Sequence, residues 1–180
     1  MAKVTARALA TLLQPTSLSP FNYIRFLLQN GGLEGELRRA RIGQYARLVR
    51  LLTEVMNRNI CLRTCSVEDL ESLPGIGPKT ARFFILHTRL DQTYAVLDVH
   101  IMRWLNEEGY EAPVRPRNNE EYAFWETIFL NHADNYTKLF TNVKIAELDL
   151  LIWTYGVKKR ERTFNGNFNQ YLKLVMESGV

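Results

Sequence analysis

The stretch from Leu73 to Ala81 constrains the fold of this chain more than any other, because it reads as a tight turn between two helices. Gly75 and Gly77 stand one residue apart, each beside a proline, and a mostly apolar run follows them. Glycine adopts backbone conformations that other residues avoid, and it lets the backbone come close to a partner. Pro78 suits the first turn of the outgoing helix, where its missing N–H costs nothing. We therefore predict a helical hairpin at this point of the chain.

The predicted hairpin is also a candidate anion site. Free backbone N–H groups of such a turn, together with the N-terminus of the helix that follows, suit a phosphate. The incoming helix is short, and Ser66 can cap it with Asp69 three residues on. Lys79 occupies the first turn of the outgoing helix, where the macrodipole disfavours a cation. Lys79 therefore meets a phosphate, is solvated, or serves as a neutral amine.

A second polar residue, Asp98, follows Lys79 by nineteen positions and opens another helical run from Val99 to Leu105. A carboxylate suits a helix N-terminus, so the simplest interpretation of Asp98 is an N-cap. Hairpin, lysine and aspartate together resemble the helix-hairpin-helix, Gly/Pro-rich loop and aspartate signature of the DNA glycosylase superfamily. Endonuclease III, 8-oxoguanine glycosylase and the adenine-mismatch glycosylase belong to that superfamily.

The resemblance implies a chemistry for the lysine and the aspartate. In bifunctional members the lysine at the place of Lys79 is the nucleophile, and the aspartate at the place of Asp98 assists. Monofunctional members keep the aspartate and have another residue at the lysine. The resemblance therefore implies a base-excision glycosylase with β-lyase (AP lyase) activity, acting on duplex DNA through a lysine Schiff base. For that chemistry we expect Lys79 to be partly buried, and we expect no metal and no organic cofactor.

The substrate base is less constrained. Lysine plus aspartate without cluster cysteines resembles the 8-oxoguanine glycosylases, which implies an oxidised purine. One compact branch of that group reads the base through a C-terminal lysine, whereas this chain ends in residues 177–180, Glu-Ser-Gly-Val. Two alternatives stay open: a non-catalytic helix-hairpin-helix protein that only binds DNA, and a glycosylase that removes a natural modified base.

Charge points to an acidic partner such as DNA. The net charge is +4 and the pI about 9.1. Between Glu34 and Arg63, seven arginines stand against three glutamates. Such arginines form either a solvated face or a binding patch, and beside a phosphate-binding hairpin we expect Arg38, Arg39 and Arg41 to bind DNA. In the hairpin itself we expect DNA contacts from Gly75, Ile76, Gly77 and Thr80.

Cys61 and Cys65 are the only cysteines. A four-iron cluster needs about four thiolates, so the cluster of the endonuclease III relatives is not expected here. No apolar run approaches the length of a membrane span. We interpret residues 1–13 as a helix rather than a signal, and we expect a monomer located in the cytoplasm, at the nucleoid or in a nucleus.

The hydrophobic pattern predicts an all-α protein, because no alternating strand of useful length occurs. The expected helices cover residues 2–13, 21–28, 44–58, a short segment after 66, 80–90, 99–105, 120–133, 142–155 ending at Gly156, and 168–176. We expect two helical lobes around a cleft. Residues 18–90 form one lobe, which ends in the hairpin at 73–77, and residues 1–17 with 91–180 form the lobe that holds Asp98.

Three further residues follow from the resemblance. In the superfamily a loop after the second helix fills the gap left by an extruded base, and Asn30 (or its neighbour Gln29) stands there. The alternative for Asn30 is an ordinary C-cap turn. In 8-oxoguanine glycosylase a C-terminal helix contacts the extruded base, and the resemblance implies this role for Phe164 and Phe168 in the tail after Gly156.

Overall fold

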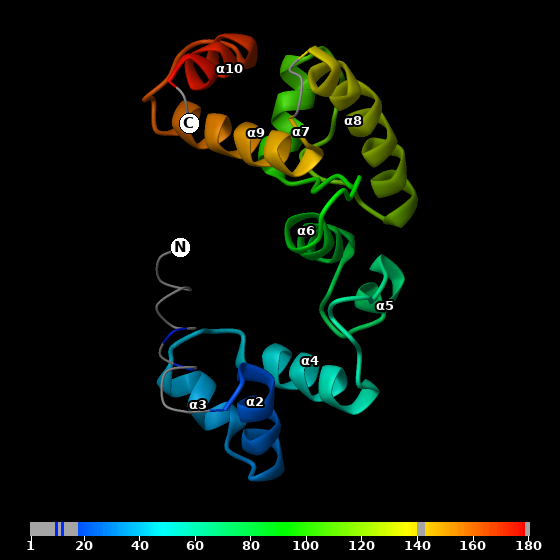
Figure 1. Ribbon diagram of the computed structural model, residues 1–180, viewed down its shortest axis with the longest axis vertical. Coiled ribbons are helices and arrows are strands. Elements are labelled where there is room, and N and C mark those ends of the chain that lie inside the picture. The colour runs from blue at the N-terminus through cyan, green and yellow to red at the C-terminus, as the bar shows by residue number, and fades with distance from the viewer. Residues whose placement is uncertain (1–9, 11, 13–17, 140–142, 179–180) are drawn as a thin grey trace. The chain divides into compact units, whose positions relative to one another are not determined.

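The structure, a computed structural model, describes residues 10, 12, 18–139 and 143–178. In this part of the chain all regular structure is helical, which confirms the predicted all-α class (Figure 1). The predicted helix at 2–13 lies outside the described residues apart from positions 10 and 12. The helices are α2 (Pro20–Gln29), α3 (Leu33–Arg39), α4 (Tyr45–Arg58), α5 (Val67–Glu71), α6 (Pro78–Thr88), α7 (Val99–Glu107), α8 (Asn119–Leu139), α9 (Ile145–Arg160) and α10 (Phe168–Glu177).

The chain divides into two compact units, Met1–Ile76 and Gly77–Val180. The boundary falls before α6, and α6 contacts α9 within the second unit. The predicted first lobe ends at residue 90, and the predicted second lobe includes residues 1–17. That arrangement of lobes, and the cleft between them, stay predictions.

The first unit has a small core in which α2, α3 and α4 contact one another. Its buried side chains include Leu12, Tyr23, Ile24, Leu27, Leu33 and Leu37. α3, which lies between α2 and α4, is a helix that the sequence did not predict. Its seven residues offer only two apolar positions, Leu33 and Leu37, so no helical period stands out.

The core of the second unit is aromatic. Trp104 of α7 is 1% exposed, and its ring meets Phe129 and Tyr136 of α8 and Phe168 of α10 at centroid distances of 5.5 to 5.7 Å. Aromatic pairs in such tilted or edge-on geometry add to the free energy of burial. This cluster fixes α7, and with it the residue at the N-terminus of α7, relative to α8 and α10.

The prediction that a helix ends at Gly156 is wrong, because α9 continues through this glycine to Arg160. The reason is packing with α7. A Cβ atom at position 156 would lie 2.2 Å from Nδ1 of His100, so the missing side chain makes room for the imidazole. Gly156 therefore allows α7 and α9 to approach closely, rather than stopping the helix.

Candidate functional site

The first half of the hairpin belongs to the first unit and begins with α5. Ser66 Oγ accepts a hydrogen bond from the Asp69 amide at 3.1 Å, and Asp69 Oδ2 accepts one from the Ser66 amide at 2.8 Å. This reciprocal capping box confirms the predicted start of α5. The turn that follows closes with a 3.2 Å bond from the Ile76 amide to the Leu73 carbonyl.

Gly75 is required at its position for two reasons. Its φ is +84°, in the left-handed region that favours glycine. In addition, a Cβ atom there would lie 2.6 Å from Nε of Arg47, whose side chain extends over the glycine from α4. The hairpin glycine therefore fits both the turn and the packing of α4 against it.

The second half of the hairpin belongs to the second unit and forms the N-terminus of α6. Gly77 is the N-cap of this helix, and Pro78 lies in its first turn as predicted. The carbonyl of Gly77 accepts bonds from the amides of Thr80 at 2.9 Å and Ala81 at 3.1 Å. Pro78 has no N–H, so the amide of Lys79 remains as a first-turn donor for a ligand.

The side chain of Lys79 is exposed, so the expectation of partial burial is wrong. Beside it the second unit has a pocket of about 290 Å³, whose lining includes Lys79, Leu97, Arg115 and Arg117. Arg115 and Arg117 were not predicted to belong to a site. Two arginines on either side of Pro116 were the signal that could have identified them.

Asp98 is the N-cap of α7, which confirms the simplest interpretation of this residue. Its Oδ1 accepts hydrogen bonds from the amides of His100 at 2.7 Å and Ile101 at 3.0 Å. The side chain is half-buried. Because both capping bonds use Oδ1, Oδ2 is left to interact with a ligand.

Lys79 and Asp98 share one electrostatic neighbourhood in the second unit. Burial lowers the pKa of His100; the charge of Asp98 opposes this shift, while that of Lys79 adds to it. Burial also raises the pKa of Asp149 to about 6. The hydrogen bond between His87 Nε2 and Asp149 Oδ2, at 2.9 Å, opposes this shift by lowering the pKa. Asp98 adds to the upward shift of Asp149 and Lys79 opposes it. The lysine and the aspartate therefore both act on His100 and on Asp149.

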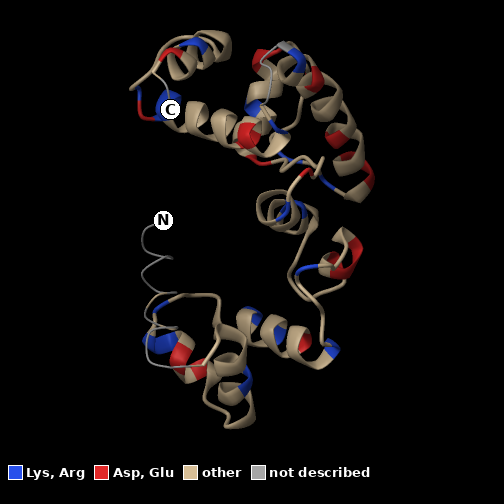
Figure 2. Cartoon of the chain, in the orientation of Figure 1, with Lys and Arg blue, Asp and Glu red and all other residues tan. Residues whose placement is uncertain are grey.

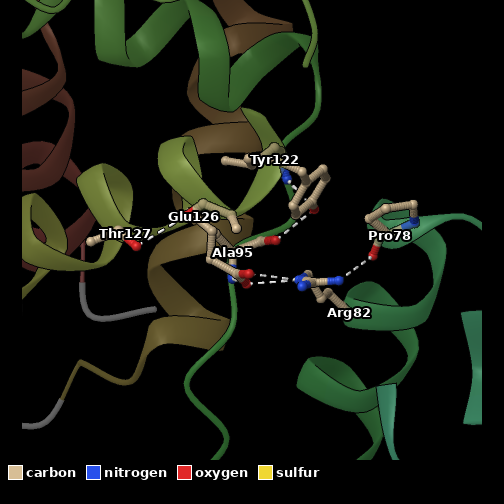
Figure 3. A network of polar contacts seen from close by, with 8 residues as sticks. Pro78, Arg82, Ala95, Tyr122, Glu126 and Thr127 are labelled. Carbon is tan, nitrogen blue, oxygen red and sulfur yellow. Dashed lines mark hydrogen bonds and ion pairs between the residues drawn. The ribbon is translucent and has the colours of Figure 1, made fainter. Parts of the chain in front are cut away.

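A buried polar network connects the helix of Lys79 with the segment that leads to Asp98 (Figure 3). Arg82 of α6 pairs with Glu126 of α8, with Nε 2.7 Å from Oε2. Glu126 Oε1 accepts a 3.0 Å bond from the Ala95 amide. The hydroxyl of Tyr122 donates to the Ala95 carbonyl at 2.8 Å and accepts from the Leu97 amide at 3.1 Å.

The network therefore fixes the backbone of residues 95–97 directly before Asp98. Tyr122 is buried, and burial raises the pKa of its hydroxyl well above the ordinary value, so this group stays protonated and able to donate. The hydrophobic pattern predicted that Tyr122 faces inward from a helix, but it did not predict the hydrogen bonds of the hydroxyl. An apolar face shows which residues turn inward but not which backbone groups their polar tips meet.

The remaining predicted DNA-binding residues lie in the first unit. Asn30 is the C-cap of α2, and its Nδ2 donates to the Phe26 carbonyl at 2.8 Å, as the C-cap alternative holds. Arg38 pairs with Glu34 at 2.6 Å on α3, and Arg39 binds Glu36 on the same helix. Arg41 is exposed at the end of this segment with φ +54°. Contact of these residues with DNA stays a prediction.

The two predicted base-pocket residues differ in their surroundings. Phe168 is 1% exposed and packs against Trp104, Tyr136 and Tyr155, so its ring belongs to the core and is not offered to a ligand. Phe164 is half-buried and meets the rings of Tyr155 and Tyr171. Part of the Phe164 ring is therefore exposed and able to contact a base. The Phe168 ring would have to leave the core to do so.

No helix in the described ranges is both long and apolar enough to cross a membrane. No solved structure matches the chain. A family model for the helix-hairpin-helix motif matches residues 62–83, the segment that contains α5, the Gly75–Gly77 turn and the first half of α6. The chain therefore has a helix-hairpin-helix motif, and the function that this motif implies is binding of nucleic acid.

Proposed function

We propose that this protein is a DNA glycosylase with β-lyase activity, in which Lys79 is the nucleophile and Asp98 assists. The observation that supports the proposal most is geometric: Lys79 lines one pocket of the second unit together with Leu97, the residue directly before Asp98. The matched hairpin supplies the DNA-binding part of the same proposal. The resemblance to the 8-oxoguanine glycosylases favours an oxidised purine as the base removed.

The reaction begins with the target nucleotide flipped out of the duplex, since its glycosidic carbon cannot be reached inside the stack. The neutral amine of Lys79 attacks C1′ of the sugar, the bond from C1′ to the base breaks, and the base takes up the proton that the newly formed ammonium releases. Asp98, ionised, stabilises the positive charge that develops on the sugar through its free Oδ2. No metal is needed for these steps.

Lyase chemistry follows from the covalent intermediate. Opening of the sugar ring converts the C1′ amine adduct into an imine between Lys79 and C1′. A base removes a proton from C2′, and the phosphate at C3′ leaves with the electrons of its C–O bond, which cuts the strand. Hydrolysis of the imine then restores Lys79.

Borohydride trapping tests the assignment of the nucleophile. The reductant converts the imine into a stable amine, so wild-type protein becomes covalently attached to DNA that contains an abasic site. We expect Lys79→Gln to lose trapping while it still binds the same duplex. Lys173→Gln, a change at an exposed lysine of α10, is the matched control and keeps trapping. Equal trapping by Lys79→Gln and wild type would show that another amine is the nucleophile.

The match to the hairpin alone also favours a second function, a DNA-binding protein without catalysis. Such a protein leaves abasic-site DNA intact, or nicks it no faster than Lys79→Gln does. A panel of duplexes, each with one altered base, then separates removal of a damaged base from removal of a natural modified base.

A further inference from the structure

We propose that three arginines of α4, Arg47, Arg50 and Arg58, extend the DNA-binding surface of the hairpin, with Arg50 as a direct phosphate contact. We refer to these three residues as the α4 arginine row. The inference rests on the DNA-binding part of the proposed function and is independent of its chemistry. All the contacts that support it lie within the first unit.

The row occupies one side of α4, because positions three and eleven residues apart lie on the same helix face. Figure 2 shows the basic residues distributed along this helix. From Arg47 to Arg58 the helix rises about 16 Å, over which one DNA strand presents about five phosphates. One acidic residue, Glu54, interrupts the row and pairs with Arg58 at 2.9 Å.

Arg47 holds the hairpin turn. Its guanidinium donates to the carbonyl oxygen of Gly75, and its Nη1 donates to Gln44 Oε1 at 2.7 Å. A guanidinium on this carbonyl offsets the partial negative charge of the oxygen, which would otherwise repel an anion at the turn. Arg47 is therefore a positioning residue for the hairpin.

Arg58 holds the other end of the same segment. Its Nη1 donates to the hydroxyl oxygen of Ser72 at 3.0 Å, directly after α5. The two end residues of the row thus fix the hairpin segment Ser72–Gly75 against α4, with Arg50 between them along the helix.

Arg50 is the member of the row that remains for a ligand. It is exposed, and within the described part of the chain it forms no ion pair. It lines a groove of about 390 Å³ whose other polar lining residues are Thr53, Glu54, Arg58 and Ser72. A free guanidinium beside a phosphate-binding turn matches the planar, bidentate geometry that a phosphate offers.

The occupant is a nucleic-acid backbone because the groove adjoins the segment that the helix-hairpin-helix model matches. The arginines of α3 make a contrast, since Arg38 and Arg39 are already bound by Glu34 and Glu36. The carboxylate of the groove, Glu54, is paired with Arg58 at 2.9 Å, which leaves the guanidinium of Arg50 for a phosphate.

The test is the salt dependence of binding, measured by fluorescence anisotropy with the full chain and a labelled undamaged duplex. Each phosphate contact contributes about 0.9 to the slope of log K against log salt concentration. We expect Arg50→Gln to weaken binding and to lower the magnitude of the slope by about 0.9. Arg50→Lys keeps the charge and most of the slope. Lys138→Gln, which removes a charge already paired with Asp134 on α8, is the matched control and leaves the slope unchanged.

An unchanged slope in Arg50→Gln, or an equal decrease in Lys138→Gln, would overturn the inference. Thermal melting of each variant shows that it is folded, as expected for a change at an exposed side chain. The result of this binding test can be distinguished from the result of the borohydride-trapping test of Lys79. If Lys79→Gln still forms the trapped complex while Arg50→Gln loses slope, the proposed nucleophile fails and the binding surface stands.

Discussion

Replacing Gly156 by alanine tests the packing of α7 on α9, which places Asp98 in the second unit. Two effects of opposite sign compete. Alanine favours a helix interior over glycine by about 1 kcal/mol, and Gly156 lies inside α9. Against this, the new Cβ atom would lie 2.2 Å from Nδ1, 2.9 Å from Cγ and 3.1 Å from Cβ of His100.

The contact distances decide the sign. Rotation of the imidazole moves Nδ1 away but leaves Cβ of His100 in place, and the ring is 6% exposed with Trp153 edge-on at 6.0 Å. The helices must therefore separate, and overpacking of a well-packed core costs about 1 to 3 kcal/mol. Together with the helix-propensity gain of about 1 kcal/mol, this gives a net loss of up to about 2 kcal/mol in the free energy of unfolding.

Urea denaturation followed by tryptophan fluorescence measures this change, because all three tryptophans lie in the second unit. A lower midpoint at unchanged m value reports lost stability, and a loss of about 1 kcal/mol lowers the melting temperature by about 2 to 4 °C. The control is the same change in a His100→Gly background, where no Cβ atom remains at position 100 and Gly156→Ala stabilises by up to about 1 kcal/mol. If alanine raised the stability equally in both backgrounds, the packing explanation would be refuted.

Two further predictions concern buried polar groups of the second unit. Burial raises the pKa of Asp149 from 3.8 to about 6, so its contribution to stability is complete below about pH 4 and is lost as the pH rises through about 6. The free energy of unfolding of wild type minus that of Asp149→Asn should therefore fall over this window by up to about 3 kcal/mol in urea titrations, and a flat difference would contradict the assignment. Glu126→Gln removes the charge that pairs with Arg82. Because the side chains of Arg82 and Glu126 are only 16% and 13% exposed, this change should lower the free energy of unfolding by about 3 kcal/mol in the same assay. If the network positions Asp98, this variant also traps abasic-site DNA more slowly at unchanged DNA affinity; equal trapping rates would restrict Glu126 to a structural role.

Local signals in the sequence predicted the local structure well. The capping box of Ser66 and Asp69, Pro78 in the first turn of α6 and Asp98 as the N-cap of α7 each depend on residues within one helical turn. Such features are determined by side chains next to the backbone groups that they satisfy. For that reason they could be placed without knowledge of the tertiary fold.

The features that the sequence did not predict depend on residues far apart in the chain. Gly156 looked like a helix stop, and only the approach of His100 from α7 explains why the helix continues through it. The contact between His87 and Asp149 joins residues 62 positions apart. A carboxylate within the apolar run of α9 was a visible signal of a buried charge, but its partner could not be identified from periodicity alone.

The position of Asp98 shows how one residue can serve both structure and chemistry. An N-cap needs one acceptor oxygen, and Asp98 uses Oδ1 for both amides that it caps. The cap fixes the carboxylate at the N-terminus of α7, the positive end of the helix dipole. A carboxylate that is held in place before substrate arrives stabilises a developing cation without reorganisation during the reaction. The structural role therefore does not compete with the proposed catalytic one, because the cap uses Oδ1 and leaves Oδ2 for the sugar.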